Sequence, residues 1–292
     1  MSDRRVLITD IAWPDISIEA AVLGPAGFAV SLAPAGDEET LVREAAGADA
    51  ILTCFAQVTS RVIAASDRLS VVARTGVGLD NIDVVECERR GVAVTRVPDY
   101  CVDEVATHTV ALALALWRRL PQYDRALRAG EWGTRPATLP LRRLTGTTVA
   151  ILGMGRIGSA VADRLRGFGL RVGEDVTDAD IVCVHLPLKP DTERFVDADL
   201  LAKVRPGAVL VNTGRGAVVD VEAVIDALDS GQLSGAGLDV FPTEPLEGDH
   251  PLRERDDVIL TPHVAFYSEE ALVELRQRAA QSVVDHFDGS DR

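Results

Sequence analysis

The feature that most limits the fold of this chain is an alternation of short β-branched segments with helical patterns, which occurs twice. The first series predicts helices near 17–24, 38–47, 60–66 and 83–90, between strands at 6–10, 29–33, 50–54, 70–75 and 92–97. Such alternation is typical of a parallel sheet with helices on both faces, because parallel strands are joined by crossover connections. This series therefore predicts a doubly wound α/β domain of the flavodoxin-like kind.

The same pattern starts afresh at Thr148, after a long apolar helix predicted at 102–120 and a loop rich in Pro, Gly and Arg at 121–146. The second series predicts helices near 197–203 and 220–230 and further strands at 180–186, 207–213, 236–241 and 258–261. A chain of 292 residues is also longer than one hydrophobic core usually supports, about 250 residues. We therefore predict two domains, a substrate domain of residues 1–99 plus 264–292, which includes an amphipathic helix at 268–287, and a Rossmann dinucleotide-binding domain of residues 100–263.

Composition and charge argue against several classes of function. A net charge of −15 disfavours binding to nucleic acid, whose phosphates need clustered Lys and Arg. Neither a zinc site nor a disulfide framework is predicted, because the cysteines lie far apart, at Cys54, Cys87, Cys101 and Cys183. The first strand begins too close to Met1 for a signal peptide, and the stretch 102–120 carries charges that a membrane span would exclude. We expect a cytoplasmic protein with no metal, membrane or nucleic-acid partner.

A glycine-rich turn of the form G-x-G-x-x-G runs from Gly153 to Gly158, directly after an apolar strand and directly before a helical pattern. In that context the glycines allow a tight turn, a close approach of the main chain to a pyrophosphate, and close packing of the helix on the strand. The N-terminus of the helix then offers free N–H groups to the anion. Glycine-rich turns without a ligand are common, but this context favours a dinucleotide site with contacts from Gly153, Gly155, Arg156, Ile157 and Gly158.

Three polar residues, Arg215, Glu244 and His263, each follow the end of a predicted strand in the second series. Open parallel sheets bind ligands at the carboxyl ends of their strands, so these side chains are expected to converge. An arginine fork can hold a carboxylate and polarise a carbonyl group. A histidine can exchange a proton with an alkoxide, and a carboxylate bonded to it would orient it and stabilise its charged form.

Each of these residues also has a simpler interpretation. Arg215 could belong to a turn, Glu244 to a surface loop, and His263 could be a buried histidine bonded to the main chain, since polar loop residues are most often merely solvated. Together, and after a dinucleotide-type turn, they favour catalysis. The expected reaction transfers a hydride between a nicotinamide dinucleotide and C2 of a small 2-hydroxy or 2-oxo acid.

Several longer motifs occur along nearly the whole chain: RTGVGLDNID from Arg74, GMGRIG from Gly153, HLPL from His185, VNTGRG from Val211, GLDVFPTEP from Gly237 and TPH from Thr261. In this order and spacing they resemble the D-2-hydroxyacid dehydrogenase family. Two further runs, 97–105 and 262–270, are similar to the branch that contains the C-terminal binding proteins and their bacterial relatives. The resemblance implies that Arg215, Glu244 and His263 are the catalytic set. It also implies that the main chain at Val77 and Gly78, with Arg215, receives the substrate carboxylate.

For the cofactor, the resemblance implies that Asp239 holds the nicotinamide amide and that Thr213 and Gly214 line the site. The implied cofactor is NAD, with NADP not excluded. The helix at 102–120 would belong to a homodimer interface. The remaining histidines match no catalytic position and are expected to be structural or surface residues: His108, His185, His250 and His286.

The chain departs from the family's pattern between the glycine-turn helix and the strand at 180–186. Roughly twenty residues of the expected βαβ unit are absent, and a parallel crossover needs a dozen or more. Residues 174–180 reach at most about 25 Å over a path near 20 Å, so they could connect the strands only as a taut thread. We therefore favour a segment omitted from the sequence over a true deletion, which would damage the adenosine half of the site. Glu174 and Asp175 are the candidates for the acid that distinguishes NAD from NADP.

A second hypothesis is a dimeric NAD(H) sensor that regulates a partner without turnover. The branch resemblance and the shortened adenosine half favour the sensor, whereas the intact trio of Arg215, Glu244 and His263 favours the enzyme.

Overall fold

The computed structural model describes residues 4–133 and 141–290. The chain divides into two compact units, one formed by Met1–Tyr100 with Ser268–Arg292 and the other by Cys101–Tyr267. Each unit has its own parallel sheet, which confirms the predicted α/β class.

The sheet of the first unit has five parallel strands in the order β2-β1-β3-β4-β5. Their bounds are β1 (Arg4–Ile8), β2 (Phe28–Leu32), β3 (Ala50–Thr53), β4 (Val71–Arg74) and β5 (Ala93–Arg96). This is the flavodoxin-like order that the sequence predicts.

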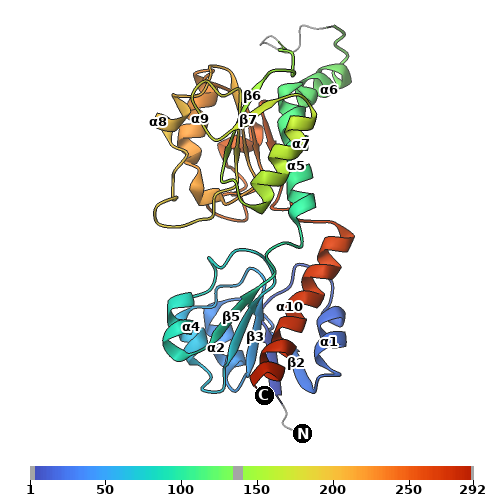
Figure 1. Cartoon of the computed structure of the whole chain (residues 1–292), viewed down its shortest axis with the longest axis vertical. Helices are drawn as coiled ribbons and strands as arrows, with labels where there is room; N and C mark the ends of the chain where they lie inside the picture. The colour runs from blue at the N-terminus through green and yellow to red at the C-terminus, as the bar shows by residue number, and fades with distance from the viewer. Residues whose placement is uncertain (1–3, 134–140, 291–292) are drawn as a thin grey trace. The chain divides into compact units, whose positions relative to one another are not determined.

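Helices cover both faces of this first sheet, as Figure 1 shows. On one face lie α2 (Glu38–Ala45), α3 (Ser60–Ala64) and α4 (Val84–Arg90), whose apolar residues join a core with Leu7, Ile51 and Val72. On the other face lie α1 (Ser17–Leu23) and the C-terminal helix α10 (Glu269–Ser290), packed on Val6, Leu52 and Val71. A buried ion pair between Arg276 and Glu19, at 2.7 Å, fixes α10 against α1.

The sheet of the second unit has six parallel strands in the order β11-β10-β9-β8-β6-β7. Their bounds are β6 (Thr148–Leu152), β7 (Arg171–Gly173), β8 (Ile181–Val184), β9 (Ala208–Asn212), β10 (Leu233–Leu238) and β11 (Val258–Leu260). Helices α5 (Val102–Trp117) and α7 (Arg156–Gly167) pack on one face, and α8 (Ala198–Leu201) and α9 (Val221–Asp229) on the other (Figure 1). Two 3-10 turns, η1 (Gly216–Val218) and η2 (Pro251–Glu254), follow β9 and β10.

The prediction of one helix to residue 120 followed by a loop from 121 is wrong in part. Helix α5 ends at Trp117, and a second helix, α6 (Leu120–Arg128), follows. Arg119 separates them because its φ of 54° is left-handed, a conformation that no α-helix continues through. Pro121 then stands in the first turn of α6, where its missing N–H group is tolerated. Residues 134–140 of the predicted loop lie outside the described residues.

The preference for an omitted segment is also wrong for this chain, because residues 174–180 make the whole connection from β7 to β8. They do so as a short thread without a helix, in which residues 176–179 form a turn with a left-handed Asp178 (φ of 56°). Val176 packs against the core on the α8 and α9 face. The N–H group of Asp178 donates to the Lys203 oxygen at 3.0 Å, and that of Asp180 donates to the Thr148 oxygen at 2.9 Å. Strand β7 is consequently the edge of the sheet, where a six-stranded Rossmann order would place one more strand.

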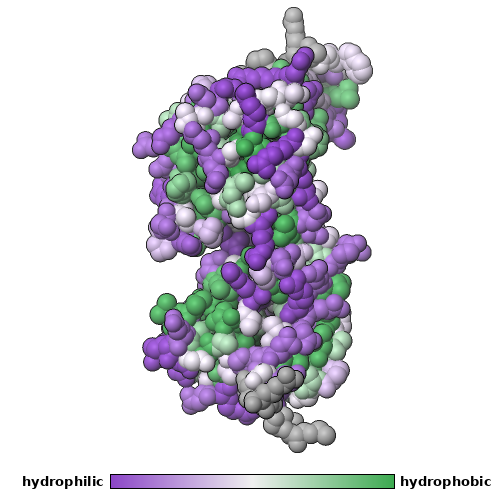
Figure 2. Space-filling model, viewed as in Figure 1, coloured by the Kyte–Doolittle hydropathy of each residue, from purple (hydrophilic) through white to green (hydrophobic). Residues whose placement is uncertain are grey.

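Hydrophilic residues are spread over the face of the molecule seen in Figure 2. Among the described residues, no helix combines the length and the apolar character that crossing a membrane requires.

Candidate active site

Arg215 stands on a tight turn directly after β9. The buried side chain of Asn212 closes this turn, because its Nδ2 donates to the Arg215 oxygen at 3.1 Å and its Oδ1 accepts from the Gly214 N–H group at 3.0 Å. Nη1 of Arg215 donates to the Gly214 oxygen at 2.9 Å. The guanidinium is therefore held, half-buried, at the carboxyl end of the strand.

Glu244 reaches the same end of the sheet through a close contact between two loops. A Cβ atom on Gly216 would lie 1.9 Å from the carbonyl carbon of Phe241, so only glycine lets the loop after β9 touch the loop after β10. The N–H group of Phe241 in turn donates to Oε1 of Glu244 at 2.9 Å. This contact brings the loop of Arg215 beside that of Glu244.

His263 completes the predicted trio from the loop after β11. Its Nδ1 lies 2.7 Å from Oε2 of Glu244, and its N–H group donates to the main-chain oxygen of Asp239 at 2.7 Å. The residue has a φ of 53°, a left-handed conformation that is uncommon outside glycine and is typical of functional sites. The imidazole and the carboxylate, far apart in the sequence, are thus hydrogen-bonded.

The electrostatic surroundings keep Glu244 ionised. Partial burial alone would raise the pKa of its carboxyl group, because a charge is poorly solvated there. The hydrogen bond and charge of His263, the N–H group of Phe241 and the charge of Arg215 outweigh burial and lower this pKa below its ordinary value. The carboxylate can therefore stabilise a protonated imidazole.

Asp239 is buried behind His263 and organises its loop. Oδ1 accepts hydrogen bonds from the Thr261 hydroxyl at 2.6 Å and from the Val264 N–H group at 2.9 Å, and Oδ2 accepts one from the Ala265 N–H group at 2.9 Å. Three bonds to residues on both sides of His263 hold that residue in its left-handed conformation. The contact of Asp239 with a nicotinamide amide stays a prediction.

Helix α5 supplies two polar side chains that the sequence analysis did not assign to the site. His108 Nε2 lies 3.1 Å from the Thr261 hydroxyl, which already gives its proton to Asp239, so the imidazole nitrogen must be the donor. The buried Thr109 hydroxyl lies 2.8 Å from that of Thr213. Adjacent polar residues within the apolar run of α5 were the signal for this contact.

The glycine turn has the geometry that a pyrophosphate requires. Gly153 has a φ of 99°, and a Cβ atom on Gly158 would lie 2.1 Å from the Gly153 oxygen, so the turn can form only with glycine at both positions. Gly155, the residue before α7, faces open space, because a Cβ atom there would meet no described atom within 4 Å. Arg156 and Ile157 begin the helix, whose first N–H groups have no acceptor within the helix itself.

His185, expected to be structural or at the surface, lies beside this turn. A Cβ atom on Gly153 would be 2.8 Å from the main chain of His185, and Nδ1 of His185 lies 3.5 Å from the Thr213 hydroxyl. Burial lowers the pKa of His185 to about 4, so the ring is neutral near pH 7. Nε2 is buried without a hydrogen-bond partner among the described residues. An orphaned polar atom beside a glycine turn and Gly214 fits a site for a polar ligand such as a dinucleotide.

Val77 and Gly78 belong to the first unit, on the turn after β4. Nη1 of Arg96 donates to the Val77 oxygen at 3.4 Å. Within residues 4–133 and 141–290, the N–H groups of Val77 and Gly78 donate no hydrogen bond to the protein. Such N–H groups can receive an anion.

Comparison with known proteins decides the family. The model of the D-isomer specific 2-hydroxyacid dehydrogenase NAD-binding domain matches residues 110–174 and 172–265. The chain belongs to this family. It is therefore an oxidoreductase that transfers hydride between a nicotinamide dinucleotide and C2 of a small 2-hydroxy or 2-oxo acid, as the sequence predicts. Its placement in the branch of the C-terminal binding proteins stays a prediction.

Relatives and solved structures agree with this membership. The dehydrogenase is 37% identical over 269 residues to the glyoxylate reductase of Thermofilum pendens, in an alignment that covers 83% of this chain and 78% of that one. The D-lactate dehydrogenase of Aquifex aeolicus, solved with NAD and lactic acid, is 26% identical with a TM-score of 0.88 over 98% of this chain and 96% of that chain. A glyoxylate/hydroxypyruvate reductase of Sinorhizobium meliloti, solved with NADP and malonate, is 31% identical with a TM-score of 0.84, over 98% and 94%.

The comparisons also locate the shortened segment of this dehydrogenase. The family model matches in two pieces that meet at residues 172–174, where β7 ends. The alignment with the Thermofilum protein runs over 269 residues but takes in only 83% of the 292 residues here, so more than twenty positions of that relative have no counterpart. Both findings agree with the thread at 174–180.

Proposed function

We propose that this dehydrogenase interconverts a small D-2-hydroxy acid and its 2-oxo acid with NAD(H), using His263 as acid and base, Glu244 to orient it and Arg215 as the substrate clamp. The observation that carries the proposal is the 2.7 Å hydrogen bond between Nδ1 of His263 and Oε2 of Glu244, beside the Arg215 turn. Because Glu244 engages Nδ1, Nε2 is the nitrogen that exchanges a proton with the substrate oxygen.

The chain's own residues account for binding and proton transfer. The cofactor, when bound, supplies the hydride to C2 in reduction and takes it back in oxidation. Arg215 binds the carboxylate and polarises the carbonyl group. The N–H groups of Val77 and Gly78 are proposed, from the family resemblance, to bind a substrate carboxylate. His263 gives its Nε2 proton to the alkoxide oxygen that forms, and Glu244 stabilises the protonated ring before that step.

A preference for NAD over NADP is supported by charge. Glu174 lies directly after β7, close to the twenty residues beyond Gly153 at which an acid binds the ribose hydroxyl of NAD, and Asp175 follows it. Both carboxylates are exposed and would repel a 2′-phosphate. Their acid groups favour a ribose that carries a free hydroxyl.

The apolar surface of α6 supports a homodimer. No residue of α6 is buried, and Leu120 and Leu127 are more than half exposed although they belong to an amphipathic helix. A second copy that packs along α5 and α6 would cover this surface. A cytoplasmic location remains part of the proposal.

The proposal is tested by following NADH consumption with a panel of 2-oxo acids, such as glyoxylate, pyruvate, hydroxypyruvate and phenylpyruvate. His263→Ala should lower kcat by about 10²- to 10⁴-fold, the usual contribution of a general acid, while the Kd for NADH changes little. His250→Ala is the matched control, because His250 caps η2 through its Nδ1 and lies outside the trio. Unchanged turnover in His263→Ala would remove this residue from the mechanism.

The NAD(H) sensor is separated by the same panel. Tight NADH binding with no turnover of any 2-oxo acid would favour the sensor. The observation that supports the sensor hypothesis is the shortened connection at 174–180.

A further inference from the structure

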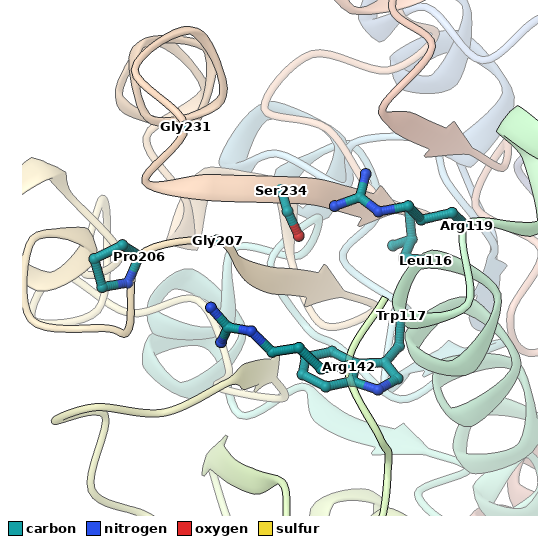
Figure 3. A pocket seen from close by; sticks show the side chains of 8 residues that line it. All are labelled: Leu116, Trp117, Arg119, Arg142, Pro206, Gly207, Gly231 and Ser234. Atoms are coloured by element: carbon teal, nitrogen blue, oxygen red, sulfur yellow. The ribbon is translucent and has the colours of Figure 1, made fainter. Parts of the chain in front are cut away.

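A pocket at the amino ends of the strands of the second sheet, opposite the end that carries Arg215 and Glu244, takes no part in the proposed reaction. It has a volume of about 240 Å³, and Figure 3 shows the side chains that line it. Pro206 and Gly207 precede β9, and Gly231 precedes β10, so the pocket opens at the amino ends of the strands. Arg215 and Glu244 follow the carboxyl ends of the same strands. A ligand in the pocket would therefore leave the reaction site accessible.

The pocket contains a buried cation without a counter-ion. Arg119 is only 8% exposed, yet its guanidinium makes no hydrogen bond or ion pair within the part of the chain that the structure describes. The titratable groups that act on it electrostatically are Tyr123 and Asp257, and both carboxylate oxygens of Asp257 already accept bonds from Arg255, at 2.8 Å each. Arginine is almost never this buried unless it is paired, because an unpaired charge loses its hydration. We therefore expect the Arg119 guanidinium to bind an anion.

A second guanidinium lies across the pocket. In Figure 3 the charged ends of Arg119 and Arg142 both point toward the space beside Ser234 and Gly207. Arg142 is only loosely paired, with Nη1 3.5 Å from Oδ1 of Asp180, whereas Arg205 lies 2.7 Å from the same oxygen. Arg142 can thus turn to a ligand without leaving Asp180 uncompensated.

The rest of the wall is apolar. Leu116 and Trp117, from the end of α5, and Pro206 line the pocket next to the two guanidinium groups. The volume is somewhat smaller than that of pockets for drug-sized ligands, which start near 300 Å³. The lining therefore suits a molecule of about the size of one ring that carries one anionic group.

We propose that this pocket binds a small organic anion, with its carboxylate or phosphate between Arg119 and Arg142 and its apolar part against Leu116 and Trp117. Two arginine forks are well matched to planar carboxylates and to phosphates. The proposal is independent of the reaction assigned to Arg215, Glu244 and His263.

Calorimetry and thermal unfolding test it, with the full-length dehydrogenase saturated with NADH. The probes are benzoate compared with acetate, and phenyl phosphate compared with inorganic phosphate. The two pairs separate carboxylate from phosphate, and within each pair the difference in affinity measures the contribution of the phenyl ring. We expect at least one aromatic probe to bind and to raise Tm, and to bind more tightly than its small counterpart. Equal binding of the small and aromatic probes, or no binding of any probe, would overturn the proposal.

Matched variants locate the binding. Arg142→Ala, at a half-exposed side chain, should weaken the aromatic probe by about tenfold or more, since a hydrogen bond to a charged group contributes that much. Arg119→Gln should weaken the probe similarly and raise Tm without any probe, because a buried unpaired charge is removed. Arg205→Ala should weaken the probe in part, because Asp180 then has Arg142 as its remaining arginine partner and competes with the probe for it. Arg215→Ala, in the reaction site, should leave probe binding unchanged. Unchanged binding in Arg142→Ala and Arg119→Gln, or its loss in Arg215→Ala, would contradict the assignment.

Discussion

The main chain of Gly216 lies against that of Phe241 so closely that any side chain on Gly216 would overlap the Phe241 carbonyl group. This contact sets the distance between the loop that presents Arg215 and the loop that presents Glu244. The spacing of the candidate catalytic groups therefore depends on a residue that has no chemistry of its own.

Gly216→Ala should separate these two loops. The overlap is with main chain and cannot be relieved by a side-chain rotation. We therefore expect a loss of about 1 to 3 kcal/mol in the free energy of unfolding, which is typical of overpacking. The fall in kcat/KM, expressed as a free energy, should be larger than this loss. Urea denaturation and NADH consumption measure the two effects. Gly248→Ala, where a Cβ atom has open space, is the control. Full activity in Gly216→Ala would show that the close contact is not needed.

Glu244→Gln should change the pH dependence of stability. The folded-state pKa of Glu244 is lowered, so the stabilisation from its charge is present above the ordinary glutamate pKa and is lost as the pH falls through the lower, folded-state value. The wild type should therefore be more stable than Glu244→Gln near pH 7, with a difference that shrinks as the pH falls below about 4.5. Urea denaturation at a series of pH values measures it. A difference that stays constant with pH would argue against a charged partner for His263.

Gly155→Ala should weaken dinucleotide binding without disturbing the fold. Gly155 has a φ of −74°, which alanine adopts readily, and its Cβ atom would meet no protein atom within 4 Å. The methyl group would instead occupy the space in front of the α7 N-terminus, and we expect the Kd for NADH to rise roughly tenfold, equivalent to about 1.4 kcal/mol. Gly167→Ala, at the other end of α7 and also in open space, should leave the Kd unchanged. NADH fluorescence titration reads both variants.

The shortened connection at 174–180 should reduce the contribution of the adenosine half of the cofactor. Strand β7 is the sheet edge, and in residues 141–290 no further strand pairs with its outer side. We expect NADH to bind less than about tenfold more tightly than reduced nicotinamide mononucleotide, which lacks the adenosine. The glyoxylate reductase of Thermofilum pendens, measured in parallel, should show a larger ratio. A similar and large ratio in both proteins would mean that the thread replaces the lost contacts.

Much of the fold could be predicted from the sequence, because local backbone and packing requirements fix which residues each element can contain. Buried parallel strands need continuous apolar runs, their crossovers need amphipathic helices, and the turn from Gly153 to Gly158 needs glycine, so two α/β domains and a dinucleotide turn follow from residue order alone. The hydrogen bond between Glu244 and His263 could also be anticipated, because parallel strands deliver the residues at their carboxyl ends to one edge.

Other features depended on the tertiary structure. The break between α5 and α6 rests on one left-handed residue, Arg119, that periodicity does not reveal. The thread at 174–180 is held by the packing of Val176 on the core and by main-chain hydrogen bonds of Asp178 and Asp180. The bonds from Asp239 to the loop of His263, and the open face of a buried Arg119, join segments that are distant in sequence. Sequence determines what each segment can become, since those preferences are local. Which side chains meet is decided only when the sheet brings separate loops together.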